Sequence, residues 1–283
     1  MNNLKFKIAK LLEDVIGRRN LVRTGRFLLD YARRDLPNNI VSNGEWMVQE
    51  TILKYSATPK MVIVDVGANV GLWSQHILEL ANSNNHDVEL HAFEPSYLTF
   101  QKLVENLSPF QGDNIHLINS AISDKDGSGT LFKPHELAGS NSLYEVEQEN
   151  HNLTKETIKL ERLDDYCSRQ GVTYIDLLKL DVEGHDFIVL DSIKDLMANH
   201  IIQVVQFEYN HRWISSRHFL RDVFELLIPI GYRIGKVTPN AIEWYENWSS
   251  ELETFREANY IGALKEPEMW FSSMKWWNAN SNS

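Results

Sequence analysis

The stretch Asp65-Val66-Gly67-Ala68-Asn69-Val70-Gly71 decides the fold of this 283-residue chain. It follows an apolar run at 61–64 and precedes apolar residues at helical spacing, at 73, 77, 80 and 81. A strand, a glycine turn and a helix in this order open a pocket for a nucleotide-like ligand in α/β folds. The glycines allow a sharp turn close to the ligand, and the helix start offers unpaired N–H groups to an anionic group.

The spacing of the glycines narrows the choice of ligand. A dinucleotide turn follows G-x-G-x-x-G, in which the middle glycine lets a pyrophosphate touch the backbone. Here the pattern is G-x-x-x-G with Asn69 inside it. This pattern suits a ligand without pyrophosphate, such as S-adenosylmethionine (SAM), and disfavours a nicotinamide dehydrogenase; a purely structural turn is the alternative. The next apolar run ends at Glu94-Pro95, where a carboxylate can accept hydrogen bonds from both ribose hydroxyls or can be a surface group.

Strand and helix patterns alternate from residue 61 onward, which predicts an α/β fold with a mainly parallel sheet. Strands are predicted at 61–66, 88–93, 115–118, 174–180 and 201–207, and a late antiparallel pair at 232–237 and 259–264. Right-handed crossovers bring the carboxyl ends of parallel strands to one edge of a sheet. We therefore expect one crevice that is lined by Gly67, Glu94, Ser120-Ala121, Asp181 and Glu208.

Three regions are predicted along the chain. Residues 1–56 form an N-terminal helical addition, 57–265 the SAM-binding domain, and 266–283 a C-terminal tail. The tail belongs to a Trp-rich end that includes Trp244, Trp248, Trp270, Trp276 and Trp277. Within the domain, an insertion at about 127–163 interrupts the alternation with two extra strands, at 129–132 and 157–160. Residues 1–34 hold nine Lys or Arg and three Asp or Glu, a net charge of +6. Such a basic amphipathic segment can make peripheral contact with membrane lipid, or it can be a solvated helix face.

Composition excludes several classes of function. A net charge of −11 and a pI near 5.4 argue against extended binding to nucleic acid. No apolar stretch approaches the roughly 20 residues of a transmembrane helix, and no apolar signal core is visible near the N-terminus. Cys167 is the single cysteine, so an internal disulfide is impossible and a cytoplasmic location is the default. No pattern predicts the oligomeric state.

Six segments together resemble the FkbM family of SAM-dependent methyltransferases. They are VDVGANVG (64–71), FEP (93–95), NSAISDKDG (119–127), ERLDDY (161–166), DLLKLDVEGHDFIVL (176–190) and QFEYN (206–210). The resemblance covers roughly residues 60–265, and the DLLKLDVEG part is the most distinctive. It implies a class I methyltransferase fold, which is Rossmann-like and has seven strands of which the last is antiparallel. It also implies methyl transfer, most often to a hydroxyl oxygen of a sugar or natural product.

Donor binding is assigned to residues at the expected crevice. Gly67, Asn69 and Gly71 would shape the turn against the methionine end, and Asp65 would bind the ammonium group or brace the turn. Glu94 would bind the ribose. The adenine is expected beside Ser120 and Ala121, and Ser142 lies in a polar loop (139–144) that could close over the ligands or be a surface turn. Asp124 is a further candidate, although Ser-Asp-Lys-Asp-Gly is also an ordinary turn.

Methyl transfer to an alcohol needs an in-line acceptor and a way to remove the hydroxyl proton. Glu208, Asp181, His185 and His211 are the candidate catalytic residues. The oxygens of Asp181, Glu208 and Asn210 could instead hold a divalent metal that lowers the pKa of the hydroxyl. Lys179 should share a strand face with Asp181 and needs an acidic partner such as Asp181 or Asp65.

The predicted function is therefore O-methylation of a hydroxyl on a sugar or other small molecule. N- or C-methylation of a natural product, or SAM binding without catalysis, remain the alternatives.

Overall fold

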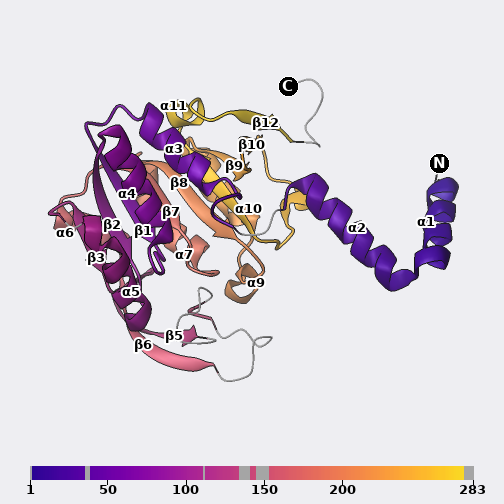
Figure 1. The fold of residues 1–283 in the computed structure, drawn as a ribbon, viewed down its shortest axis with the longest axis horizontal. Coiled ribbons are helices and arrows are strands. Elements are labelled where there is room, and N and C mark those ends of the chain that lie inside the picture. Colours follow the sequence, from indigo (N-terminus) through magenta and orange to yellow (C-terminus); the bar gives the residue numbers. More distant parts are fainter. Residues whose placement is uncertain (1, 36–38, 111, 134–140, 145–152, 277–283) are drawn as a thin grey trace. The chain divides into compact units, whose positions relative to one another are not determined.

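The computed structural model of the chain describes residues 2–35, 39–110, 112–133, 141–144 and 153–276 (Figure 1). Its contacts separate two compact units, residues 1–37 and 38–283. In the first unit, helices α1 (Asn2–Ile16) and α2 (Arg18–Arg33) are joined at Gly17. None of the side chains described in α2 is buried. No helix among the described residues is both long and apolar enough to cross a membrane.

The second unit is built on a nine-stranded sheet in the order β12-β10-β9-β11-β8-β7-β1-β2-β3. Its parallel part has the following strands: β1 (Lys60–Val66), β2 (Asp87–Phe93), β3 (Ile115–Ile118), β7 (Ile175–Leu180) and β8 (Ile202–Tyr209). Strand β11 (Ala258–Ala263) runs antiparallel between β8 and β9 (Arg233–Val237). These seven strands have the predicted arrangement, including the late antiparallel pair, so the class I methyltransferase fold is confirmed.

Two strands that the sequence did not predict extend this sheet. Strand β10 (Ile242–Tyr245) pairs antiparallel with β9, and β12 (Ser273–Lys275) pairs with β10. The region predicted as a tail thus contributes β12 and α11 (Lys265–Glu268). Trp276 packs edge-on against Tyr245 of β10, whereas Trp277 lies outside the described residues.

Helices cover both faces of the sheet because its strands are apolar on both sides. One core packs α3 (Glu45–Tyr55), α4 (Leu72–Asn84) and α5 (Tyr97–Leu107) against one face. The other face is covered by four elements: α6 (Leu163–Gln170), α7 (Asp186–Ser192), α8 (Lys194–Ala198) and α10 (Leu220–Leu227). Short connecting helices are η1 (Ser108–Phe110), α9 (Trp213–Ser216), η3 (Ile228–Ile230) and η4 (Ser250–Leu252).

The predicted insertion forms a separate three-stranded sheet of β4 (Ala121–Ile122), β6 (Thr154–Glu161) and β5 (Gly127–Lys133). Its two long strands pair antiparallel, in agreement with the extra strands expected from the sequence.

The predicted addition at 1–56 spans the division between the two units. Its third predicted helix is α3, which belongs to the second unit and buries Val48 and Ile52 in the core beside α4. Burial of α3 matters for the site because its first residue, Glu45, faces the same edge of the sheet as the glycine turn.

Candidate active site

The carboxyl ends of the parallel strands open onto a cavity of about 640 Å³, including its open mouth. The lining comprises Val66, Gly67, Asn69, Glu94, Pro95, Ser120, Ala121, Ile122, Leu131, Asn141, Leu143, Asp181, Val182 and Glu183. The structure therefore brings together residues that lie more than 100 positions apart, as the parallel sheet required, whereas Glu208, which was also expected in this crevice, is not among the lining residues. Leu131 of β5 and Leu143 add walls from the insertion.

The glycine turn after β1 fits closely against the ends of its two neighbouring strands, β7 and β2. Gly67 has φ +83°, and a Cβ atom there would lie 2.0 Å from the carbonyl oxygen of Asp181. The N–H groups of Gly67 and Ala68 both donate to the carbonyl of Phe93, at 3.0 and 2.9 Å. Any side chain at Gly67 would collide with the backbone after β7, so this position requires glycine. The open side of the turn is the side that faces the ligand cavity.

Glu94 lies at the tip of β2 and braces this turn. Its Oε2 accepts the backbone N–H of Asn69 at 3.0 Å, and its Oε1 accepts that of Ser96 at 2.9 Å. Burial raises the pKa of Glu94 to about 7, against the lowering effect of these two N–H donors. The sequence indicated a ribose ligand here but gave no sign of the bracing role.

A second cavity, of about 800 Å³ including open space, lies on the other side of the turn. It shares Gly67, Asn69 and Asp181 with the first cavity and is further lined by Glu45, Trp73 and Lys179. A ligand with two ends can therefore lie across the glycine turn with one end in each cavity.

Lys179 connects the acids of this second cavity. Its Nζ lies 3.0 Å from Oδ2 of Asp181 and 3.8 Å from Oδ1 of Asp65. Burial alone would lower the pKa of Lys179, but these carboxylates raise it above its usual value, so the ammonium stays charged. Asp65 is fully buried and accepts the hydroxyl of Ser74 at 2.6 Å.

Glu45 is a member of the site that sequence reasoning missed. Its carboxylate accepts the amide N–H groups of Asn43 at 2.7 Å and Gln206 at 2.8 Å, and burial raises its pKa. The available signal was the polar pair Glu45 and Gln49, which stands at helical spacing on the otherwise apolar face of α3.

Three carboxylates meet where β7 and β8 end. One oxygen each from Asp181, Glu183 and Glu208 can be chosen so that all lie within 4.8 Å of one another. Burial, followed by the charges of Asp181 and Glu183, raises the pKa of Glu208 well above its usual value. Burial and Asp181 raise the pKa of Glu183 to about 8, against the lowering effect of Arg212.

Asn210 and Arg212 hold the cluster in place. The Asn210 amide nitrogen donates to Glu208 at 2.6 Å and to Glu183 at 3.3 Å, and Arg212 Nη1 donates to Glu183 at 2.5 Å. The Asn210 Oδ1 atom accepts the backbone N–H of Arg212 at 2.8 Å. Asn210 thus turns its donor, rather than the oxygen expected of a metal ligand, toward the carboxylates. Arg212, which sequence reasoning also missed, supplies the neighbouring positive charge.

The two histidines considered as bases lie elsewhere. Both ring nitrogens of His185 are engaged, Nε2 by the Ser123 hydroxyl and Nδ1 by the Tyr144 hydroxyl, each at 3.0 Å. Burial lowers the pKa of His185 to about 4, so its imidazole is neutral at physiological pH. His211 is exposed in the turn after β8.

Two predicted serines anchor the walls of the first cavity. Ser120 donates to Glu161 at 3.0 Å, and Ser142 donates to the carbonyl of Glu183 at 2.9 Å. Residues 141–144 of the predicted loop are therefore attached to the backbone of Glu183 through Ser142, while residues 139 and 140 lie outside the described residues.

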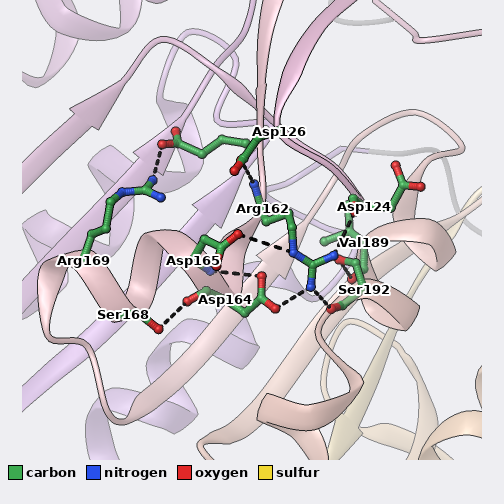
Figure 2. A network of polar contacts seen from close by, with 10 residues as sticks. Asp124, Asp126, Arg162, Asp164, Asp165, Ser168, Arg169, Val189 and Ser192 are labelled. Carbon is green, nitrogen blue, oxygen red and sulfur yellow. Dashed lines mark hydrogen bonds and ion pairs between the residues drawn. The ribbon is translucent and has the colours of Figure 1, made fainter.

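Asp124 belongs to a structural network around Arg162 (Figure 2). Arg162 donates to the carbonyls of Asp124 at 2.8 Å and Ser192 at 3.1 Å, and it also contacts the Asp164 carboxylate. The backbone N–H of Arg162 donates to Asp126 at 2.9 Å. These contacts tie the turn after β4 to α6 and α7, and Asp124 does not line the cavity of about 640 Å³.

Comparisons with known proteins agree with this geometry. Residues 65–234 match the family model of the methyltransferase FkbM domain, which is more than half of the chain. The chain is 26% identical over 198 residues to the 2-O-methyltransferase NoeI of Sinorhizobium fredii, covering 64% of this chain and 76% of that protein. It is 31% identical over 173 residues to the 31-O-demethyl-FK506 methyltransferase FkbM of Streptomyces tacrolimicus, covering 52% of this chain and 65% of that protein.

Solved structures with a similar arrangement include two other methyltransferases. A precorrin-6y C5,15-methyltransferase from Geobacter metallireducens matches 78% of this chain and 87% of its own, with a TM-score of 0.40 and 14% identity. An rRNA methylase from Streptococcus thermophilus matches 77% of this chain and 94% of its own, with a TM-score of 0.40 and 12% identity. On the family match and its own strand order, the chain belongs to the FkbM family and is a SAM-dependent methyltransferase.

Proposed function

We propose that this enzyme methylates a hydroxyl oxygen of a sugar or natural-product small molecule. The observation that supports it most directly is the buried Glu208 carboxylate with a raised pKa, beside the wall that both cavities share at Asp181. The printed names of two relatives, a 2-O-methyltransferase and a 31-O-demethyl-FK506 methyltransferase, favour the same class of acceptor.

The donor would lie across the glycine turn. Its adenosine would occupy the cavity of about 640 Å³, with Glu94 at the ribose and Ser120 and Ala121 beside the adenine. Its amino-acid end would occupy the second cavity, near Asp181 and Lys179. Asp65 is fully buried and bonded to Ser74, which favours a bracing role over contact with the ammonium group. Gly67 and Asp181 line both cavities, which supports a donor that extends from one cavity into the other.

Glu208 would act as the general base. Bound at this site, SAM supplies a methyl group already activated by a positive sulfur, and the acceptor oxygen becomes a methyl ether. Glu208 would take the hydroxyl proton, since a carboxylate with a raised pKa is a stronger base than an ordinary one. Asn210 would orient Glu208 through its 2.6 Å hydrogen bond, and Arg212 would hold Glu183.

A divalent metal at Asp181, Glu183 and Glu208 is the second candidate for activating the hydroxyl. The closeness of the three carboxylates favours it, since hard cations prefer oxygen ligands. The donor orientation of Asn210 and the guanidinium of Arg212 favour the metal-free base. Extensive dialysis against a chelator should leave turnover unchanged under our proposal, and restoration of lost activity by Mg²⁺ or Mn²⁺ would favour the metal.

We further propose that the enzyme works in the cytoplasm at an anionic membrane surface. Large apolar side chains of α1 and α2 are exposed, among them Leu11, Val15, Phe27 and Leu28. The same helices carry most of the basic residues that give 1–34 its net charge of +6. Apolar side chains that enter a bilayer, with lysines and arginines facing anionic headgroups, would satisfy both features.

The central test is a direct search for product. Purified enzyme with SAM and a library of hydroxylated sugars and natural products should yield S-adenosylhomocysteine together with a product heavier by one methyl group. Mass spectrometric fragmentation then locates the methyl on oxygen, nitrogen or carbon. A methyl on nitrogen or carbon would overturn O-methylation, and tight SAM binding with no product on any acceptor would favour a binding protein.

A further inference from the structure

A cluster of two imidazoles and a carboxylate lies on the face of the sheet that α6 covers. Glu89 and His91 are two positions apart on β2 and share a face, and His116 of β3 stands in register beside His91. The Oε1 atom of Glu89 lies 3.3 Å from Nε2 of His91 and 3.4 Å from Nε2 of His116. Strand geometry alone thus brings three potential metal ligands to one point.

The buried ring of His91 has one nitrogen engaged and one without a hydrogen bond. Its Nδ1 lies 2.8 Å from the hydroxyl of Tyr166 in α6. Its Nε2 is buried and makes no hydrogen bond, although the Glu89 oxygen is within reach. An Nδ1 contact of this kind fixes the orientation of the ring and leaves Nε2 to a ligand, as outer partners do for metal-binding histidines.

The spacing of the ligand atoms matches a small tetrahedral site. Zinc binds nitrogen and carboxylate oxygen at about 2.0–2.1 Å, which makes the edge of a regular tetrahedron about 3.3–3.4 Å. The two distances between Glu89 and the imidazole nitrogens fall on this edge. The rings stack with centroids 4.6 Å apart and planes 11° apart, so the partly exposed His116 ring must rotate out of the stack for both Nε2 atoms to bind one ion.

We propose that Glu89, His91 and His116 bind a divalent transition-metal ion, with Zn²⁺ as the best fit and water as the fourth ligand. The site goes beyond the proposed methyl transfer and shares no residue with it. The side chains of Glu89 and His116 are 21% and 32% exposed, so an ion can enter from solvent.

The electrostatic surroundings are compatible with a cation. Burial, followed by the neighbouring His116, lowers the pKa of His91 to about 4, so its imidazole is neutral and able to ligate near pH 7. Lys60 contacts the other oxygen of Glu89, Oε2, at 2.8 Å and leaves Oε1 to the metal. Since the Lys60 side chain is 47% exposed, it can move into water when the ion binds.

A metal here would stiffen the part of the sheet that carries the donor site. His91 precedes Glu94 by three residues on β2, a distance of about 10 Å along a strand. Ser120 likewise follows β3 two residues after its end. A clamp between β2 and β3 would hold these two walls of the cavity together, so its expected effect is on stability.

The experiment uses the full chain, stripped of metal with a chelator and titrated with ZnCl₂ by calorimetry. We expect one Zn²⁺ per chain and a rise in Tm of about 5 °C at zinc 100-fold above its Kd. His116→Ala and Glu89→Gln change partly exposed side chains, so both should fold, and each should weaken zinc binding at least 10-fold.

Two control variants keep the result interpretable. His200→Ala removes an exposed imidazole whose Nε2 lies 2.9 Å from the Ile230 carbonyl, and it should leave zinc binding unchanged. Glu208→Gln alters the other carboxylate cluster and should also leave this site intact. Absence of saturable zinc binding, or binding that both His116→Ala and Glu89→Gln retain, would overturn the proposal. Binding lost only in Glu208→Gln would place the ion at the carboxylate cluster and would equally overturn it.

Discussion

Replacement of Glu94 by alanine tests the assignment of the donor site. The Glu94 carboxylate accepts the N–H groups of Asn69 at 3.0 Å and Ser96 at 2.9 Å. Each oxygen keeps a second lone pair, which can accept a ribose hydroxyl. The substitution therefore removes both the bracing of the glycine turn and the hydrogen bonds to the donor.

The magnitudes can be worked out separately for affinity and stability. Hydrogen bonds to a charged group are worth about 1–3 kcal/mol, so Glu94→Ala should raise the Kd for SAM by about 5- to 150-fold. The two backbone donors lose their acceptors, but water from the adjoining cavity can replace them. Removal of a buried carboxyl whose pKa is raised to about 7 offsets part of the loss at neutral pH. The free energy of unfolding should therefore change less than the binding free energy.

The assay is calorimetric titration with SAM and with S-adenosylhomocysteine, together with urea unfolding of each variant. Both ligands carry the same ribose and should lose affinity equally. Glu79→Ala is the matched control, because Glu79 is an exposed glutamate of α4 whose carboxylate contacts Gln75 on the helix surface. An unchanged Kd in a folded Glu94→Ala protein would refute the ribose assignment.

The remaining predictions concern the base, pH and the first unit. Glu208→Gln should lower kcat by about 10²- to 10⁴-fold, as measured by steady-state kinetics, and full activity would exclude Glu208 as the base. The same variant should raise the free energy of unfolding at pH 8 by about 0.5–2 kcal/mol, as measured by urea unfolding. The raised pKa of Glu183, about 8, means that the folded state binds more protons than the unfolded state between pH 4.5 and 8. Its contribution to the free energy of unfolding should therefore fall as pH rises through that window, and Glu183→Gln should flatten the profile. A stability–pH profile of Glu183→Gln as steep as that of the parent would contradict the pKa shift of Glu183. His185, with a pKa lowered to about 4, acts in the opposite sense, since its contribution to the free energy of unfolding is lost as pH falls from 6.5 to 4. The full chain should co-sediment with anionic vesicles at low salt but not with neutral vesicles. The double variant Leu11→Glu with Leu28→Glu should lose this binding, and equal binding of the double variant would exclude membrane contact through these helices.

Motifs at strand ends were predictable because their position depends on topology alone. Once residues 61–66 and 174–180 are parallel strands, Gly67 and Asp181 must approach each other at one edge. The late pair of strands could also be predicted, since its apolar runs at 232–237 and 259–264 are long enough to form strands. Strand β12 has only three residues, none of them buried, so it lacks the period-two pattern by which a strand is recognised.

The network around the motifs could not be predicted because it depends on side-chain orientation. Asn210 was read as an oxygen ligand, but the N–H of Arg212 takes its oxygen and turns the amide nitrogen toward Glu208. His185 was read as a base, but Tyr144, 41 residues away, and Ser123, 62 residues away, occupy its ring nitrogens. Nothing in the sequence specifies such long-range pairs without an alignment of relatives.

Charge balance links the donor to the base. Three carboxylates, those of Asp181, Glu183 and Glu208, crowd one edge of the sheet, and their repulsion adds to burial in raising the pKa of Glu208 and Glu183. The sulfonium and ammonium groups of SAM are both positive, so their arrival beside Asp181 would oppose that repulsion and favour the ionised form of Glu208. The base would then become competent only when the methyl donor is in place, whereas S-adenosylhomocysteine, which lacks the sulfonium charge, would relax this effect. A donor-dependent base of this kind explains why a methyltransferase would retain a buried Glu208 beside two partly exposed acids, an arrangement whose repulsion costs stability.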